Sequence, residues 1–208
     1  MEAQSEQIVF VVDDDQSVRG ALTNLFRSME LHVRVFGSAA ELLQSKLPDV
    51  VSCLVLDIRL PGVNGLEFQT SLAKAGIHIP IIFISGHGDI PMSVKAMKAG
   101  AVDFLPKPFR DQDMLDAVIR ALDQDRNRRD GERAVSRLRH LHDSLTRRER
   151  EVMALVVSGL MNKQIAHRLQ VTEITVKIHR GNAMKKMEAR SLADLVRMAE
   201  LLGIERAS

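Results

Sequence analysis

Hydrophobic and polar residues follow two different patterns along this 208-residue chain, and the pattern changes near residue 122. Before that point, short apolar runs of strand length alternate with segments in which apolar residues recur every three or four positions, as on one face of a helix. The runs predict strands at 8–12, 32–36, 51–56, 79–85 and 101–104. The other segments predict helices at 17–29, 39–44, 65–75 and 92–99, with a fifth helix beginning near Asp111.

This order of elements predicts an α/β domain over residues 7–122. Parallel strands need crossover connections, and the intervening helices supply these on both faces of a sheet. We therefore expect a five-stranded, parallel, doubly wound sheet. The run at 32–36 is the least apolar of the five and is expected at an edge of that sheet.

The segment 123–143 has a different composition and is rich in charged residues. Val135, Leu138 and Leu141 form a sparse apolar stripe at helical spacing. This pattern favours a partly helical linker. We expect a break or kink at Gly131, because glycine weakens the interior of a helix.

Residues 144–208 predict an all-helical domain. Thr146 and Glu149 have the spacing of a capping box at the start of its first helix. A short helical segment, a tight turn and a longer helix then follow, which predicts a helix-turn-helix at about 162–181. Helix caps are expected at Thr146, Thr172 and Ser191.

The distribution of charge changes the picture of the two halves. Residues 1–122 carry 11 Lys and Arg against 15 Asp and Glu, a net charge of −4, whereas residues 123–208 carry 18 against 12, a net charge of +6. A basic domain suits nucleic acid as a partner. No apolar run reaches membrane-spanning length and no signal peptide is recognised, so the expected location is cytoplasmic, without a membrane partner. The single cysteine, Cys53, lies in an apolar run and is expected to be a core residue.

Polar side chains follow several of the predicted strands at the point where each strand ends. They are Asp13, Asp14, Asp57, Ser85 and Lys107. The carboxyl ends of parallel strands meet at one edge of a sheet, so these side chains are expected to converge. Carboxylates that converge repel one another unless a cation lies among them, which predicts a divalent metal, Mg²⁺ or Mn²⁺. Asp57 is the candidate nucleophile for phosphoryl transfer, with Lys107 and Ser85 contacting phosphate oxygens. Asp15 is expected to be a helix cap instead.

Residues 7–122 resemble the receiver domain of two-component response regulators. The resemblance rests on four motifs: VVDDD at 11–15, LDIRLPG at 56–62, ISGHGD at 84–89 and LPKPF at 105–109. It implies that Asp57 accepts a phosphoryl group from a sensor histidine kinase. Asp14, Asp57 and the backbone carbonyl of Arg59 would hold the metal, and Asp13 would act through water. Ser85 and Phe104 match the switch pair of the family, and the Lys107–Pro108 bond would be cis.

The predicted second helix of the helix-turn-helix carries short polar side chains near its start and cations along its length. This arrangement can contact phosphates and base edges in a DNA major groove. A solvated, charged helix face is the alternative that the charges leave open. The polar and cationic residues are Thr172, Thr175, Lys177, His179, Arg180, Asn182, Lys185 and Lys186.

The same region is similar to the LuxR-type helix-turn-helix through LTRREREV at 145–152, NKQIA at 162–166 and TVKIHR at 175–180. The whole chain thus resembles FixJ-type regulators, near those of aromatic degradation. The resemblance implies that Lys177, Ile178 and Gly181 face the groove of double-stranded DNA, whereas Thr172, Thr175 and Arg180 hold the DNA backbone. His179 is the histidine expected to touch DNA, and Lys185 is expected to contact phosphate.

These features predict a phosphorylation-switched transcription regulator, an activator in type, that forms a homodimer when phosphorylated and works with RNA polymerase. It would not be an enzyme beyond taking up phosphate and removing it again. Two alternatives remain at this point. One is a hydrolase with Asp57 as transient nucleophile. Haloacid-dehalogenase-like enzymes place a second aspartate two residues after the nucleophile, and the presence of Arg59 at that position argues against this alternative. The other is a constitutive DNA-binding protein with a vestigial receiver, against which stands the complete set of acidic residues.

Overall fold

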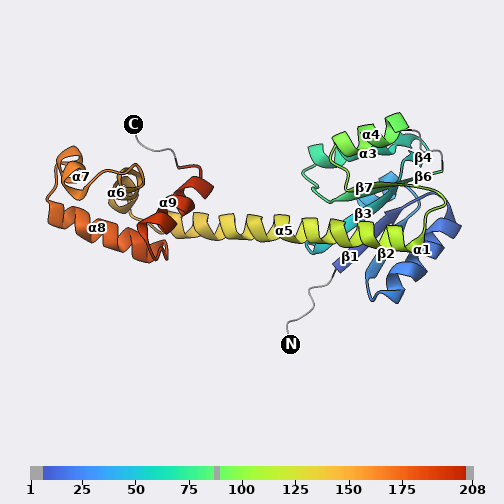
Figure 1. Ribbon diagram of the computed structural model, residues 1–208, viewed down its shortest axis with the longest axis horizontal. Helices are drawn as coiled ribbons and strands as arrows, with labels where there is room; N and C mark the ends of the chain where they lie inside the picture. Colours follow the sequence, from blue (N-terminus) through green and yellow to red (C-terminus); the bar gives the residue numbers. More distant parts are fainter. Residues whose placement is uncertain (1–6, 87–89, 205–208) are drawn as a thin grey trace. The chain divides into compact units, whose positions relative to one another are not determined.

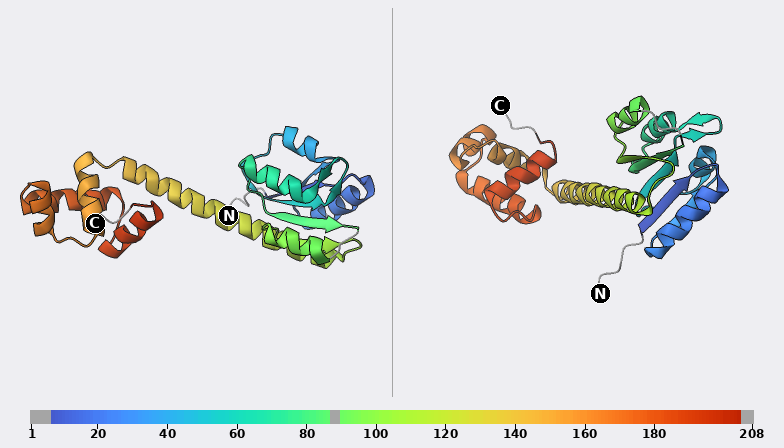
Figure 2. Two further views of the ribbon diagram at one scale, coloured as in Figure 1. Left: turned by 90° about the horizontal axis from the view of Figure 1, so that it is seen from above. Right: turned by 45° about the vertical axis from the view of Figure 1, so that its right-hand side comes forward.

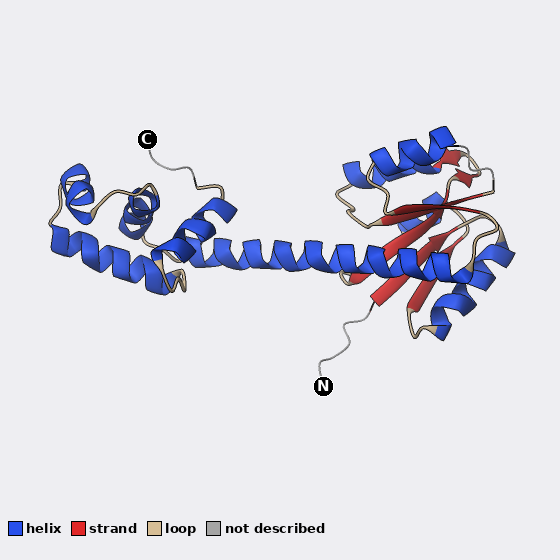
Figure 3. Cartoon of the chain, viewed as in Figure 1, coloured by secondary structure: helices blue, strands red, loops and turns tan. Residues whose placement is uncertain are grey.

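The computed structural model describes residues 7–86 and 90–204 (Figure 1). The chain divides into two compact units, Met1–Arg129 and Asp130–Ser208. Strands occur only in the first unit among the described residues, and the described part of the second unit is helical (Figure 3). No helix in the described ranges is long and apolar enough to cross a membrane.

The first unit is built on a parallel sheet with the strand order β2-β1-β3-β6-β7. Strand β2 lies at an edge, as its polar composition predicts, and β3 lies at the centre between β1 and β6. All four neighbouring pairs are parallel. The strands are β1 (Gln7–Val12), β2 (His32–Phe36), β3 (Val51–Asp57), β6 (Ile81–Ser85) and β7 (Asp103–Pro106).

Helices cover both faces of this sheet (Figure 2), as the alternating pattern of the sequence predicts. Helices α2, α3 and α4 contribute to the core on one face, and α1 and α5 contribute to the core on the other. The α/β class and the doubly wound arrangement are therefore confirmed. The helices are α1 (Gln16–Ser28), α2 (Ala39–Gln44), α3 (Gly65–Lys74), α4 (Ile90–Lys98) and α5 (Asp111–Asp143).

A small antiparallel hairpin after β3 was not predicted. It pairs β4 (Arg59–Leu60) with β5 (Val63–Asn64) across Pro61 and Gly62. Gly62 has a φ of +78°, in the left-handed region that favours glycine. Strands of two residues fall below the length at which alternation can be recognised in a sequence, so the Pro-Gly turn was the only signal.

The prediction of a break at Gly131 is wrong. Helix α5 continues through this glycine and is 33 residues long, so the segment after residue 122 is helical throughout. In the part of the chain that the structure describes, no residue outside the helical turns around Gly131 lies within 4 Å of the position where its Cβ would be, so no close packing interrupts the helix there. One glycine costs a helix interior only about 1 kcal/mol, and ion pairs such as Arg133–Asp130 act along the same stretch.

The second unit has its own hydrophobic core, formed around Val152, Ile165, Val176, Ala183 and Leu195. The predicted capping box is present, because Thr146 Oγ1 accepts from the Glu149 N–H and the Glu149 carboxylate accepts from the Thr146 N–H. Thr172 and Ser191 also cap their helices as predicted. The helices are α6 (Arg147–Val157), α7 (Asn162–Leu169), α8 (Glu173–Lys186) and α9 (Leu192–Leu201).

Candidate functional site

A lysine bridges two carboxylates at the carboxyl edge of the sheet. Lys107 Nζ donates to Asp13 Oδ2 and to Asp57 Oδ2, and both distances are 2.7 Å. Asp13 directly follows β1, Asp57 ends β3, and Lys107 follows β7. Three segments distant in sequence therefore meet where the strand pattern predicted their convergence.

Local hydrogen bonds fix each of these groups in place. Asp13 Oδ1 accepts from the N–H of Asp15 at 2.8 Å, and Asp57 Oδ1 accepts from the N–H of Arg59 at 3.0 Å. The N–H of Lys107 donates to the carbonyl of Ser85 at 2.7 Å, and the following bond to Pro108 is cis. The acidic groups thus keep one oxygen bound to the backbone and turn the other toward the lysine.

Burial and charge determine the protonation of this centre. Burial raises the pKa of the fully buried Asp13 carboxyl, while the hydrogen bond from Lys107 opposes that effect. Burial would lower the pKa of Lys107, but its hydrogen bonds to Asp13 and Asp57 outweigh burial and raise that pKa. Lys107 is therefore a firmly charged cation, able to neutralise an anion that enters the site.

The acidic cluster fits a divalent metal. Ligand oxygens of Asp13, Asp14 and Asp57 lie within 4.8 Å of one another, and Asp14 is exposed while the other two are buried. Three carboxylates form the hard oxygen donor set that Mg²⁺ takes in proteins. An acidic pocket suited to a divalent metal is therefore present at this edge of the sheet.

Two residues that support the site were missed in the sequence. Arg19 Nη1 donates to the carbonyl oxygen of Asp13 at 2.6 Å and fixes the backbone beside the acidic cluster. Gly65 packs behind Asp57, because a Cβ at this position would lie 3.1 Å from the Asp57 carbonyl oxygen and 2.9 Å from Ile58 Cα. No local motif marks Arg19, whereas Gly65, at the start of a predicted helix directly after Asn64, could have been recognised as a close approach.

The other predicted residues of the first unit have clear positions. Ser85 is buried at the end of β6, and Phe104 is half-buried on β7. The exposed Asp15 is the N-cap of α1 and accepts from the Ser17 N–H at 2.7 Å, so its predicted structural role is confirmed. Residues 87–89, which carry most of the glycine-rich motif, lie outside the described residues.

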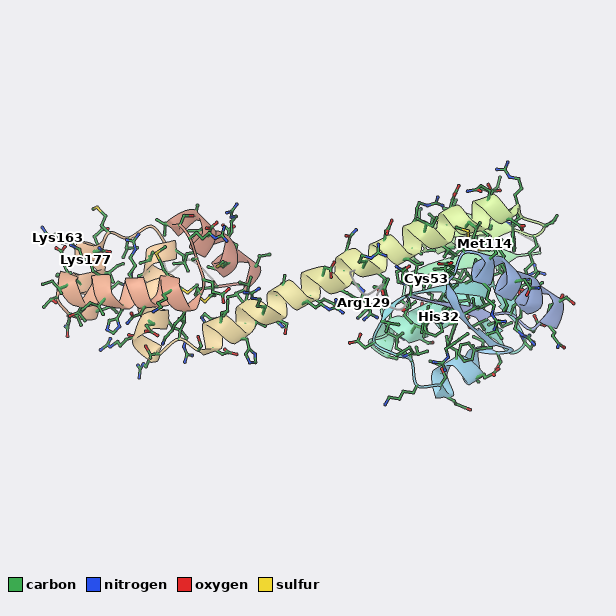
Figure 4. All side chains as sticks on the ribbon, turned by 90° about the horizontal axis from the view of Figure 1, so that it is seen from below. His32, Cys53, Met114, Arg129, Lys163 and Lys177 are labelled. Carbon is green, nitrogen blue, oxygen red and sulfur yellow. The ribbon has the colours of Figure 1, made fainter. Side chains whose placement is uncertain are left out.

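The second unit contains the predicted helix-turn-helix. Helices α7 and α8 are joined by a short turn in which Gln170 has a φ of +54°. Thr172 Oγ1 accepts from the Thr175 N–H at 3.1 Å, which begins α8. Arg180 Nη1 donates to Asn162 Oδ1 at 3.2 Å and links the two helices. The side chains of Lys163 on α7 and Lys177 on α8 are exposed (Figure 4).

Comparison with known families assigns both units. The response regulator receiver domain family matches residues 9–119, and the family of bacterial regulatory proteins called the luxR family matches residues 143–199. The chain belongs to the two-component response regulators. This response regulator has a receiver domain followed by a LuxR-type DNA-binding domain, as its motifs predicted.

Curated relatives cover nearly the whole of the response regulator. Nodulation protein W of Bradyrhizobium diazoefficiens is 64% identical over 203 residues, which are 98% of this chain and 89% of that protein. Transcriptional regulatory protein FixJ of Azorhizobium caulinodans is 43% identical over 96% of this chain and 94% of that protein. The solved structure of response regulator StyR is 49% identical, with a TM-score of 0.83 over 94% of this chain and 99% of that one. The predicted FixJ-type family is therefore confirmed.

Proposed function

We propose that Asp57 accepts a phosphoryl group from a sensor histidine kinase and that this event switches binding to double-stranded DNA and transcription of target promoters. The observation that carries the proposal is the contact of Lys107 Nζ with both Asp13 and Asp57 at 2.7 Å, beside the carboxylate of Asp14. This contact holds the carboxylate of Asp57 next to a fixed cation, at the sheet edge where α/β domains bind phosphorylated ligands.

The chemistry of transfer follows from these groups. An oxygen of Asp57 attacks the phosphorus of a phosphohistidine, the P–N bond breaks, and the electron pair returns to the imidazole nitrogen, which takes up a proton. Lys107 neutralises charge on the phosphoryl oxygens. Asp14, Asp57 and the Arg59 carbonyl would hold Mg²⁺ or Mn²⁺, with Asp13 acting through water, and the ion would supply further positive charge to those oxygens. The chain's own catalysis is limited to phosphate uptake and removal.

The switch would involve Ser85 and Phe104. The Ser85 hydroxyl, at the end of β6, would donate a hydrogen bond to a phosphoryl oxygen and draw its strand end toward Asp57. Phe104 lies one strand away on β7, paired in register with Phe83. Because Phe104 is only half-buried, it can move inward when the neighbouring strand end moves, which changes the surface of α4 and β7.

Phosphorylation is expected to favour a homodimer through α4 and β7. Ile90, Val94 and Met97 are 80%, 44% and 46% exposed on α4, which leaves apolar surface for a second copy. We expect beryllium fluoride, a phosphate mimic, to lower the dimer dissociation constant about 5- to 150-fold, the usual range of coupling between two sites. Analytical ultracentrifugation measures this constant, and Val94→Asp should remove the effect. An unchanged dissociation constant in the wild-type protein would exclude dimerisation as the switch.

The DNA-binding residues proposed for α8 divide into two groups. Lys177, Ile178 and Gly181 would face the major groove, and His179 would touch the DNA beside them. Phosphates would be held by Thr172, Thr175, Arg180 and Lys185. Lys177, Ile178, Gly181 and Lys185 are exposed, which leaves them accessible to DNA. The contact of Arg180 with Asn162 places the Arg180 guanidinium at the start of α7.

Lys177→Ala and Lys185→Ala are expected to have different effects on DNA binding. Loss of a base contact at Lys177 should reduce discrimination between target and random duplexes by about 1–3 kcal/mol. Loss of a phosphate contact at Lys185 should weaken both complexes equally and make the salt dependence shallower. Fluorescence anisotropy titrations at several salt concentrations separate the two effects. If Lys177→Ala leaves the ratio of the two affinities unchanged, its assignment to base reading is wrong.

We further propose where each of the three parts of the chain begins and ends, and where in the cell the protein acts. The receiver would span 7–122, the helical linker 123–143 and the DNA-binding domain 144–208, in line with the residues that the two family models match. A regulator that binds promoter DNA would act in the cytoplasm together with RNA polymerase, as an activator in type. The hydrolase and the constitutive DNA-binding protein have no observation in their favour, since the acidic site is complete and Arg59 follows Asp57 by two positions.

A further inference from the structure

Helix α8 has one buried face and one exposed face. Val176 and Ala183 belong to the core of the second unit and lie on the buried face. Ile174 lies on the side of the helix opposite this buried face. The residues three, four, seven and eleven positions after it form a single stripe with it on that side. All of them are exposed, and we call this stripe the α8 face: Ile174, Lys177, Ile178, Gly181 and Lys185.

Two isoleucines occupy neighbouring places on the α8 face. Ile174 is 70% exposed and Ile178 is 56% exposed. They are four residues apart on one helix, so their side chains are adjacent. Neither belongs to the hydrophobic cluster of the second unit. One exposed apolar side chain is ordinary on a protein surface, but two adjacent β-branched residues form a continuous apolar strip that suits a contact with another molecule.

Cations predominate among the charged side chains around the strip, although the exposed Glu173 lies next to Ile174 in the first turn of α8. Lys177 and Lys185 lie on the α8 face itself, and Lys163 and Arg168 are exposed on the adjoining helix α7, where they help to line a shallow depression of about 500 Å³. Such a surface is complementary to a polyanion that exposes apolar atoms inside a groove, because the cations pair with its charges and the apolar strip packs against those atoms. Duplex DNA has this character, because its major groove displays the C5-methyl group of thymine between two phosphate backbones.

Gly181 adds an observation on the same face. Among the described residues, and apart from its chain neighbours and the backbone of its own helical turns, nothing lies within 4 Å of the position where its Cβ would be, so packing against other parts of the protein does not require a glycine there. Glycine in a helix interior costs about 1 kcal/mol relative to alanine. Its missing side chain lets the backbone of α8 come closer to a surface that covers the face, and this brings Ile174 and Ile178 within reach of that surface.

We propose that Ile174, acting with Ile178, selects thymine by packing against its methyl group in the major groove. Ile174 lies in the first turn of α8, the part of a recognition helix that contacts base edges. The inference rests on the DNA-binding function proposed above and adds the base that this face selects. The proposed homodimer places one copy on each half of its DNA site. Each half-site then carries thymine where it meets the start of α8.

The test removes the methyl group alone. The full-length protein, treated with phosphoramidate and Mg²⁺, selects duplexes from a random-sequence library, and each conserved thymine of the selected site is replaced in turn by deoxyuridine. Burial of one methyl group is worth about 0.8 kcal/mol, and 1.4 kcal/mol corresponds to a tenfold change in affinity. We expect deoxyuridine at one or more positions of each half-site to weaken binding about fourfold.

The protein variant completes a double-mutant cycle with the DNA change. Ile174→Ala should weaken binding to the thymine duplex and abolish the difference between thymine and deoxyuridine at one position, because the methyl group then has no partner. Leu192→Ala is the matched control, since Leu192 is 41% exposed on α9 and lies off the α8 face. It should retain the full fourfold difference.

The outcomes distinguish the inference from the function on which it rests. If the wild-type protein binds DNA and deoxyuridine has no effect at any position, or if Ile174→Ala retains the full difference at every position, the methyl contact is absent and the inference is overturned. If Ile174→Ala binds both duplexes like wild type but loses transcription activation, the face contacts a protein and the inference is equally overturned. If no duplex binds at all, the proposed DNA-binding function itself fails.

Discussion

Asp57→Asn is expected to take up no phosphate from phosphoramidate or acetyl phosphate in the presence of Mg²⁺. The substitution keeps the size of the side chain and an oxygen that can accept from the Arg59 N–H, a bond of 3.0 Å in the wild-type protein. It removes the nucleophilic carboxylate and its ion pair with Lys107. An amide is too weak a nucleophile for phosphoryl transfer. Mass spectrometry of the intact protein and of its peptides measures the adduct and its position.

Asp15→Asn is the matched control, because Asp15 is exposed and caps α1 from the same acidic segment. It should be labelled as fully as the wild-type protein. Labelling of Asp57→Asn at the wild-type level, or an adduct mapped to Asp13 or Asp14, would contradict the assignment of Asp57 as the acceptor. DNA binding of the unphosphorylated Asp57→Asn protein should match that of the unphosphorylated wild type.

Asp125→Ala is expected to destabilise the first unit by about 3–5 kcal/mol, the cost of removing one partner from a buried ion pair. The Asp125 side chain is fully buried on α5 and accepts from the backbone N–H of Ser52 at 2.9 Å. It also pairs with Arg128 and Arg129, each at 2.6 Å. Alanine would leave the largely buried Arg129 with Asp49 alone, and the buried N–H of Ser52 without its acceptor.

Scanning calorimetry of the full-length protein measures this change, because two structural units can unfold in separate transitions. Asp123→Ala is the control on the same helix, since Asp123 is 56% exposed and pairs with Arg126 at the surface. Its effect should stay within about 1 kcal/mol, as for other exposed ion pairs. Equal small losses for both variants would show that the Asp125 cluster does not stabilise the fold.

The sequence predicted the strands and helices, whose apolar residues recur at regular spacing, and the polar residues at which those patterns begin or end. The apolar run of β3 and the strand end at Asp57 are visible without any tertiary information, because burial on both sheet faces requires a continuous apolar strand. The convergence of Asp13, Asp57 and Lys107 followed from the parallel topology alone. The capping box of Thr146 and Glu149 is local and was recognised for the same reason.

Interactions between distant residues could not be predicted in this way. Arg19 serves the acidic site through a backbone carbonyl, a contact that no motif encodes. Asp125 looks like one more charge in a polar segment, and only the fold reveals that the start of β3 needs an acceptor there. Gly131 was misread because a helix propensity describes an isolated residue, whereas the neighbouring turns decide whether the helix continues.

The reactivity of the buried Cys53 thiol on β3 reports how often the central part of the sheet opens. Cys53 has no exposed surface on β3, and burial raises its pKa, with the charge of Asp125 adding to the effect. A thiol reagent can therefore reach Cys53 only when the sheet opens. The rate of alkylation under native conditions then measures how often this opening occurs. Because Cys53 is the only cysteine of the chain, no other thiol competes for the reagent. The rate of alkylation can therefore be compared between the wild-type protein and every variant described above without introducing a further cysteine.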